Sequence, residues 1–214
     1  MFRDRRHAGE LLAALLTGYR GRAEAVILAL PRGGVPVAAA VARSLMLPLD
    51  VFPVRKIGAP IEPELAVGAL AADGVVVLDE KTIAAMQIPR ATLEAIIAAE
   101  REELLRRQRL YRGDRPPLRL DGLTTILVDD GLATGYTMLA AARAVRRQHP
   151  ARIVVAVPVA PQETLDRLHS EVDEVVCVDT PQRLEAVGQF YEDFSQVSDE
   201  QVREELSRQR DSTS

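Results

Sequence analysis

The most specific chemical pattern in the chain spans residues 126–137, where Ile-Leu-Val leads into Asp129, Asp130 and Gly131, followed by Leu-Ala-Thr-Gly-Tyr-Thr. The apolar start predicts a buried strand, and two carboxylates at its end can accept hydrogen bonds from a vicinal diol. The small residues that follow predict a loop that opens a helix, where free backbone N–H groups and the helix dipole favour an anion. A diol beside an anion describes ribose 5-phosphate. The alternative interpretation is an ordinary strand–turn–helix junction, with Asp and Gly serving only the turn.

The whole string resembles the motif that binds phosphoribosyl pyrophosphate (PRPP) in type I phosphoribosyltransferases: apolar residues, two acids, two variable residues and Ala/Asp-Thr-Gly-x-Thr. The resemblance implies that Asp129 and Asp130 hold the ribose hydroxyls. The same resemblance assigns the 5-phosphate to Ala133, Thr134, Gly135, Tyr136 and Thr137, and adds Gly131 to the residues that contact PRPP. Tyr136 stands where the family often has glycine. Members acting on 6-oxopurines usually carry Asp at the position of Ala133, which argues against hypoxanthine or guanine as the acceptor.

Two shorter motifs follow the first two predicted strands. The resemblance implies that Arg32, Gly33 and Gly34 form the pyrophosphate loop, whose glycines allow the backbone to approach the leaving group. It likewise implies that Arg55 and Lys56 supply positive charge for the departing pyrophosphate. The alternatives are a plain turn for the first motif and a solvated surface pair for the second. Asp129, Asp130 and Lys56 are the residues that we expect at the catalytic centre.

Two regions without such motifs correspond by resemblance to a lid and a hood. Residues 58–74 are rich in Gly and Pro, which predicts a loop with a possible β-ribbon and corresponds to the family's flexible lid, within an insertion of about 58–120. The insertion contains a predicted helix at 89–111 with no assigned role, whose arginines 106, 107 and 109 are predicted to form a solvated face. The hood corresponds to about 180–198, where Phe190 and Tyr191 are candidates for stacking on a base. Core packing is the alternative for these aromatic residues.

The remaining patterns predict the elements that position these motifs. Apolar spacing predicts helices at 7–17, 35–45, 140–148 and 162–169, and strands at 26–30, 49–54, 125–128, 152–157 and 174–178. The polar tail after Asp199 is predicted to be a frayed helix. Strands that alternate with helices predict an α/β fold, with a Rossmann-like, mainly parallel sheet flanked by helices in a single domain of residues 1–214.

Composition excludes several classes of protein. The chain has 214 residues, is 47% hydrophobic and carries a formal net charge of -4, which argues against polymeric nucleic acid as a partner. The lone cysteine, Cys177, lies in an apolar run and is predicted to be a core thiol. No signal peptide and no apolar run of about 20 residues is visible, so we expect a cytoplasmic protein without a membrane partner.

The function expected from the resemblance is transfer of the phosphoribosyl group from PRPP to a small nitrogenous base, with release of pyrophosphate, in nucleotide metabolism. Mg²⁺ is expected to arrive bound to PRPP, without direct protein ligands, and the family suggests a homodimer. The rival is a non-catalytic regulator of the same fold that binds PRPP or a nucleotide, although Arg55, Lys56 and the lid favour an enzyme. A phosphatase or esterase would require the acidic motif to have been misread. A P-loop kinase is excluded because the Gly-x-x-x-x-Gly-Lys-Ser/Thr string does not occur.

Overall fold

The computed structural model describes residues 1–63, 65–113, 115–116 and 118–211. Within these residues the centre of the fold is a five-stranded sheet in the order β2-β1-β6-β7-β8, and every neighbouring pair of strands is parallel. The strands are β1 (Ala25–Ala29), β2 (Leu49–Val51), β6 (Thr124–Val128), β7 (Arg152–Val159) and β8 (Glu174–Asp179). The predicted α/β fold with a parallel sheet is therefore confirmed.

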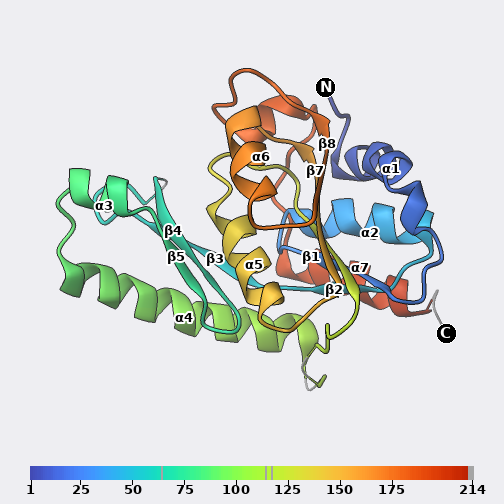
Figure 1. Cartoon of the computed structure of the whole chain (residues 1–214), viewed down its shortest axis with the longest axis horizontal. Coiled ribbons are helices and arrows are strands. Elements are labelled where there is room, and N and C mark those ends of the chain that lie inside the picture. Colours follow the sequence, from blue (N-terminus) through green and yellow to red (C-terminus); the bar gives the residue numbers. More distant parts are fainter. Residues whose placement is uncertain (64, 114, 117, 212–214) are drawn as a thin grey trace.

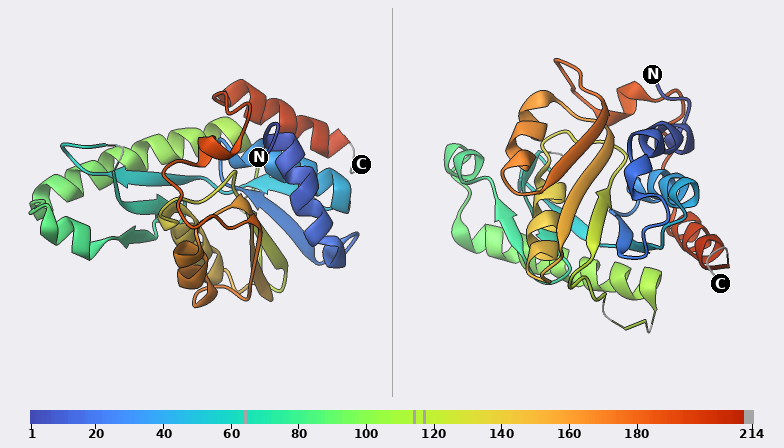
Figure 2. Two further views of the ribbon diagram at one scale, coloured as in Figure 1. Left: turned by 90° about the horizontal axis from the view of Figure 1, so that it is seen from above. Right: turned by 45° about the vertical axis from the view of Figure 1, so that its right-hand side comes forward.

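Helices cover both faces of this sheet (Figures 1 and 2). On β1, Ile27 and Ala29 pack with α1 (Arg5–Leu15) and α2 (Gly34–Leu45), whereas Val26 and Leu28 pack with α5 (Tyr136–Arg146) and α6 (Gln162–His169). Successive side chains of a strand point to opposite faces, so a strand covered on both sides is apolar throughout. This is the reason that the continuous apolar runs in the sequence predict these strands correctly.

The strand order places a topological switch point between β1 and β6. From β1 the chain moves outward to β2 on one side, and later to β6, β7 and β8 on the other. Ligands of open α/β sheets bind outside the carboxyl ends of the strands at such a point. The Arg32 loop follows β1 and the Asp129 loop follows β6, so the fold brings both motifs to this position.

The inserted segment forms a second lobe. It contains the antiparallel strands β3 (Val54–Gly58), β4 (Ala66–Ala71) and β5 (Val76–Leu78), followed by α3 (Glu80–Ala85) and α4 (Arg90–Arg112). Ile57, Leu70 and Leu104 are fully buried in a core between this sheet and the helices. In Figure 1 the lobe extends to one side of the central sheet, with α4 running along its base. The expected ribbon is confirmed, and the loop that we predicted to be a lid is limited to the connection between β3 and β4.

Several predicted boundaries require correction. The strand predicted at 49–54 is two short strands in different sheets, so Arg55 and Lys56 lie inside β3 rather than after the second parallel strand. Helix α5 begins at Tyr136, earlier than predicted, and α3 was not predicted at all. Cys177 is half-buried rather than fully buried, although it packs against the core.

The C-terminal helix also differs from its prediction. Helix α7 (Asp199–Asp211) is not frayed, because Val202 and Leu206 are buried against α2 and β2. Its start is stabilised by a reciprocal cap, in which Ser198 Oγ accepts from the N–H of Gln201 and the Gln201 side chain accepts from the N–H of Ser198. Two apolar residues one turn apart were too weak a pattern to predict a docked helix in a charged tail.

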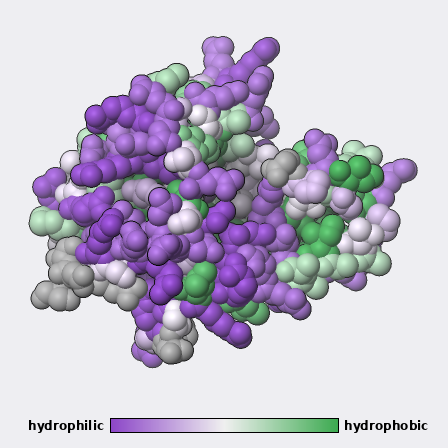
Figure 3. All heavy atoms as spheres, turned by 180° about the vertical axis from the view of Figure 1, so that it is seen from behind, coloured by the Kyte–Doolittle hydropathy of each residue, from purple (hydrophilic) through white to green (hydrophobic). Residues whose placement is uncertain are grey.

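The face of the molecule seen from behind is mainly hydrophilic (Figure 3). In the same view, apolar side chains gather on the second lobe. An apolar groove of about 510 Å³ lies there, lined mainly by Val76, Leu78, Ile83, Ile88, Leu93 and Ile97. Among the described residues, none of the helices combines the length and apolarity needed to span a membrane.

Candidate functional site

The acidic pair lies at the carboxyl end of β6, in contact with the glycine loop that follows β1. A Cβ atom added to Gly33 would lie 2.0 Å from Oδ2 of Asp130, and one added to Gly34 would lie 2.7 Å from the carbonyl oxygen of Val128. Glycine is required at both positions because the backbone of one loop rests directly on the other. The peptide bond between Pro31 and Arg32 is cis. The structure therefore brings the predicted acidic motif into contact with the predicted glycine motif.

A third contributor, Arg5 of α1, was missed. Its Nε donates to Oδ2 of Asp130 at 2.8 Å, and its Nη1 donates to the carbonyl oxygen of Ser195 at 2.8 Å. The guanidinium also lies 3.9 Å from the centroid of the Phe194 ring, and the side chain is only 11% exposed. In the sequence Arg5 is one of several arginines near the N-terminus, and nothing in its local pattern distinguishes it from Arg3 or Arg6.

The enclosure of the two carboxylates perturbs their ionisation. Burial raises the pKa of Asp129 well above its ordinary value, and the neighbouring charge of Asp130 raises it further. Burial also raises the pKa of Asp130, and the Arg5 guanidinium opposes this effect. The backbone N–H of Asp130 donates to Oδ1 of Asp129 at 2.9 Å. Two acids held this close in an enclosed site favour a ligand that brings hydrogen-bond donors or positive charge.

The loop after the acids leads directly into the N-terminus of α5. Gly131 has φ 157° and packs against Val159 and Val187, and Gly135 caps the helix with φ 75°. Two side chains from α6 hold the intervening carbonyl oxygens: Thr164 donates to Ala133 at 2.7 Å and Arg167 donates to Thr134 at 3.1 Å. The carbonyl oxygens of Ala133 and Thr134 thus accept hydrogen bonds from α6. The N–H groups in the first turn of α5 have no partner within the helix and are the donors at this end of the loop.

Tyr136, the departure from the family pattern, has its partners on α3 and α6. Its hydroxyl is hydrogen-bonded to Asp79, the N-cap residue of α3, and the guanidinium of Arg167 lies 5.5 Å from its ring centroid. Burial and the bond to Asp79 raise the pKa of Tyr136 to about 12. Tyr136 therefore connects the predicted phosphate loop to the second lobe. Thr137 is half-buried one residue further along α5, and Thr134 is exposed in the loop.

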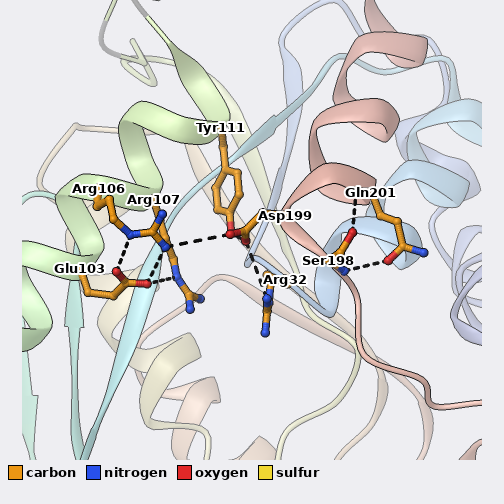
Figure 4. A network of polar contacts seen from close by, with 8 residues as sticks. All are labelled: Arg32, Glu103, Arg106, Arg107, Tyr111, Ser198, Asp199 and Gln201. Atoms are coloured by element: carbon orange, nitrogen blue, oxygen red, sulfur yellow. Dashed lines mark hydrogen bonds and ion pairs between the residues drawn. The ribbon is translucent and has the colours of Figure 1, made fainter.

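Arg32 pairs with Asp199 at the start of α7, and Asp199 also contacts the long helix α4 (Figure 4). Its Nη1 lies 3.8 Å from Oδ1 of Asp199, and the same oxygen accepts a hydrogen bond of 2.5 Å from the hydroxyl of Tyr111 on α4. Arg106 lies 4.0 Å from Asp199, and it also pairs with Glu103 at 2.6 Å. Arg106 is exposed, as predicted for a solvated helix face. Arg107 is not, because it is 18% exposed and paired with the same glutamate.

The predicted basic pair lies on the second lobe. Arg55 donates to Glu100 of α4 at 2.6 Å. Together with Lys56 it lines a pocket of about 390 Å³ whose other walls are Gly58, Ala59, Pro60, Pro63, Ile96 and Glu100. The pocket therefore lies directly under the loop between β3 and β4. A contact of this basic pair with pyrophosphate stays a prediction.

The predicted hood packs against the N-terminal segment of the chain. Phe2 forms a parallel bridge with Tyr191, and the rings of Phe2 and Phe194 lie 5.2 and 5.0 Å from the ring of Tyr191. Tyr191 is buried and its hydroxyl donates to the carbonyl oxygen of Asp130 at 2.6 Å. Core packing, the alternative interpretation, therefore describes Tyr191, which forms part of the wall behind the acidic loop. Phe190 is half-buried in the same cluster, and its contact with a base stays a prediction.

The described residues contain no group of three or more His, Cys, Asp and Glu side chains arranged to hold a metal ion.

Comparison with known proteins agrees with this geometry. Residues 5–194 match the model of the phosphoribosyl transferase domain. A Mycobacterium tuberculosis protein named "Putative phosphoribosyl transferase Rv0571c" is 44% identical over 202 residues, which cover 94% of this chain and 45% of the relative. The chain thus spans less than half the length of that curated relative.

Two solved structures are similar in fold. The crystal structure of TT1426 from Thermus thermophilus is 46% identical, with a TM-score of 0.78 and coverage of 97% of this chain and 98% of the other. The AQ2163 protein from Aquifex aeolicus, at 15% identity, has a TM-score of 0.53 and coverage of 86% and 78%, and it shares the fold alone. With a family model that matches most of its length, the chain belongs to the phosphoribosyl transferase family.

Proposed function

We propose that this protein transfers the 5-phosphoribosyl group of PRPP to a small nitrogenous base and releases pyrophosphate. The observation that carries this proposal is the direct contact between the Gly33 loop and the Asp130 carboxylate at the switch point of the sheet. The loop after β6 offers acceptors for a diol and then opens a helix for a phosphate, and the loop after β1 offers its backbone and Arg32 to a second anion. PRPP carries these three groups around one ribose.

In the proposed reaction a ring nitrogen of the base attacks C1 of the ribose. The C1–N bond forms as the C1–O bond to pyrophosphate breaks, and the electron pair of that bond leaves with the pyrophosphate oxygen. Asp129 and Asp130 hold the ribose hydroxyls, residues 133–137 bind the 5-phosphate, and Arg32 with the backbone of Gly33 and Gly34 steadies the leaving group. Arg55 and Lys56 add positive charge from the second lobe. The loop between β3 and β4, as a lid, limits the access of water to C1.

Mg²⁺ fits this site as part of the ligand. Two carboxyl groups face one guanidinium in this enclosed site, which suits a ligand that brings its own cation. When bound with PRPP, Mg²⁺ would neutralise charge that develops on pyrophosphate. We assign it no direct protein ligand.

The first test is calorimetric titration with PRPP, with and without Mg²⁺, followed by measurement of pyrophosphate release against a panel of bases. Binding with release in the presence of one base supports the proposal and identifies the acceptor. Binding without release from any base supports the rival function, a PRPP- or nucleotide-binding regulator. Absence of PRPP binding contradicts the proposal and means that the loop at 129–137 has been misinterpreted.

A substitution tests the assignment of the acidic loop. Asp130→Asn removes the charge that accepts a ribose hydroxyl, and we expect PRPP binding to weaken by about 1–3 kcal/mol. Asp121→Asn, in the exposed turn before the amino end of β6, makes the same chemical change away from the site and should leave the affinity unchanged. Equal affinities of the two folded variants for PRPP would remove the central assignment.

A further inference from the structure

Arg5 is a cation enclosed in the site, and the proposed reaction gives it no role. It enters from α1, whereas the groups proposed to bind PRPP come from the loops after β1 and β6 and from the second lobe. Three contacts hold it in place: the ion pair with Asp130, the hydrogen bond to the Ser195 carbonyl oxygen and the stack on Phe194. A side chain that is 11% exposed and held in this way is preorganised.

The acidic pair needs such a cation. Two adjacent carboxylates in an enclosed site resist being ionised together, so one of them tends to keep a proton. A protonated Asp130 would lose most of its value as an acceptor for a ribose hydroxyl. A guanidinium cannot lose its proton at any working pH, and a carboxylate that accepts one hydrogen bond from Arg5 keeps lone pairs for a ligand.

The other charged or titratable groups around Asp130 cannot substitute for Arg5. Asp129 precedes it in the same loop, and Tyr191 and Asp193 come from the hood. Each of these is neutral or negative. Arg32, on the neighbouring loop, has its guanidinium beside Asp199. Among these described neighbours Arg5 is the cation within hydrogen-bond distance of the Asp130 carboxylate.

We propose that Arg5 is a positioning residue that keeps Asp130 ionised and directed at the Gly33 loop, through an ion pair held in place by the hood. Asp130 is thereby ready to accept a hydroxyl before the ligand arrives. The test that measures PRPP binding rests on the proposed function, whereas the test on the ligand-free protein does not. The proposed role of Arg5 also assigns a purpose to the packing of the hood against the N-terminal segment, because Phe194 and Ser195 fix Arg5 in its position.

The first test is the pH dependence of PRPP affinity in the full chain. For Arg5→Gln we expect the midpoint for loss of binding at acid pH to rise by about one to three pH units, the usual effect of removing an opposite charge from a carboxylate. Each unit corresponds to about tenfold weaker binding below both midpoints. The phosphates of PRPP titrate equally with every variant, so a difference between variants reports on the protein.

Three variants separate charge from packing. Arg5→Lys keeps the charge and should restore a midpoint close to that of the wild type. Phe194→Leu removes one of the contacts that hold Arg5 without removing a charge, so it should raise the midpoint less than Arg5→Gln does. Arg6→Gln removes the neighbouring, 72% exposed arginine and should leave the midpoint unchanged. An unchanged midpoint in Arg5→Gln, or an equal shift in Arg6→Gln, would overturn the proposal.

A second measurement requires neither PRPP nor a folded Arg5→Gln variant. The difference between the infrared spectra of the ligand-free wild type and Asp130→Asn isolates the signal of the Asp130 side chain. We expect the bands of a carboxylate at neutral pH. The carbonyl band of a protonated acid would overturn the inference about Arg5, while leaving the proposed transferase activity to be judged by pyrophosphate release.

Discussion

Replacing Gly33 with alanine tests the contact on which the proposed site depends. The added Cβ would lie 2.0 Å from Oδ2 and 2.6 Å from Cγ of Asp130. Since Cβ atoms essentially never approach other heavy atoms closer than 3.0 Å, the carboxylate or the loop must move by about 1 Å. The carboxylate has little freedom to move, because Arg5 holds the same oxygen at 2.8 Å.

The size of the effect follows from this displacement. Moving Oδ2 away from Arg5 by about 1 Å lengthens the 2.8 Å contact beyond hydrogen-bond distance. Loss of a hydrogen bond between charged groups costs about 1.5–3 kcal/mol. If the strain is instead taken up by the Arg32 loop, overpacking costs about 1–3 kcal/mol. We therefore expect PRPP affinity to fall roughly ten- to hundredfold, with a loss of about 1–3 kcal/mol in the free energy of unfolding.

The assay is calorimetric titration with PRPP, together with urea-induced unfolding of the ligand-free protein. Gly18→Ala is the matched control, because a Cβ at Gly18 meets nothing within 4 Å. Its unfolding free energy should change by no more than about 0.5–1 kcal/mol, since it affects mainly the unfolded chain. If Gly33→Ala bound PRPP as tightly as Gly18→Ala does, the close packing of the two loops would have no part in ligand binding.

Two further predictions concern stability. Leu206→Ala should lower the free energy of unfolding by about 2–5 kcal/mol, because the Leu206 side chain is buried at 1% exposure. The control, Arg203→Ala on the exposed face of α7, should change this free energy little. Equal midpoints of the two variants in urea-induced unfolding would indicate that α7 is not docked on the protein. The pKa of Tyr136 is raised from 10.0 to about 12 in the folded state, so its neutral form contributes stability that is fully present below pH 10 and is lost as the pH rises to about 12. Tyr136→Phe should therefore lose less stability than the wild type over this pH range in urea titrations, and parallel losses would contradict the assignment.

The strands of the central sheet and the order of the site motifs could be predicted from the sequence. Buried parallel strands are apolar on both faces, so β1, β6, β7 and β8 appear as continuous apolar runs bounded by polar residues. The acids and glycines at 129–135 follow such a run directly. Local spacing was sufficient here because each motif is contiguous in the chain and its chemistry depends on neighbouring residues.

Prediction failed where burial depends on distant partners. Leu49–Val54 was predicted as one strand, but Pro53 separates two strands that pair with different neighbours. Helix α7 carries only two clearly apolar positions on its buried face, and its docking depends on the surface that α2 and β2 offer. From the sequence, the ring of Tyr191 could equally well stack on a base or pack in the core. Only the structure shows that this ring packs against Phe2 and Phe194.

Short contiguous patterns in the chain were enough to identify the family and the α/β fold, and to predict the acidic and glycine loops that the structure brings together. Three contacts became known only from the packed fold: Arg5 pairs with Asp130, Asp199 and Tyr111 lie beside Arg32, and Phe194 supports Arg5. Arg5 and Asp130 are 125 positions apart in the chain. A charged side chain in the unfolded chain is solvated and has no fixed partner, and leaving water costs free energy unless a partner is present. Its partner is therefore determined by the packing that encloses it rather than by its neighbours in sequence.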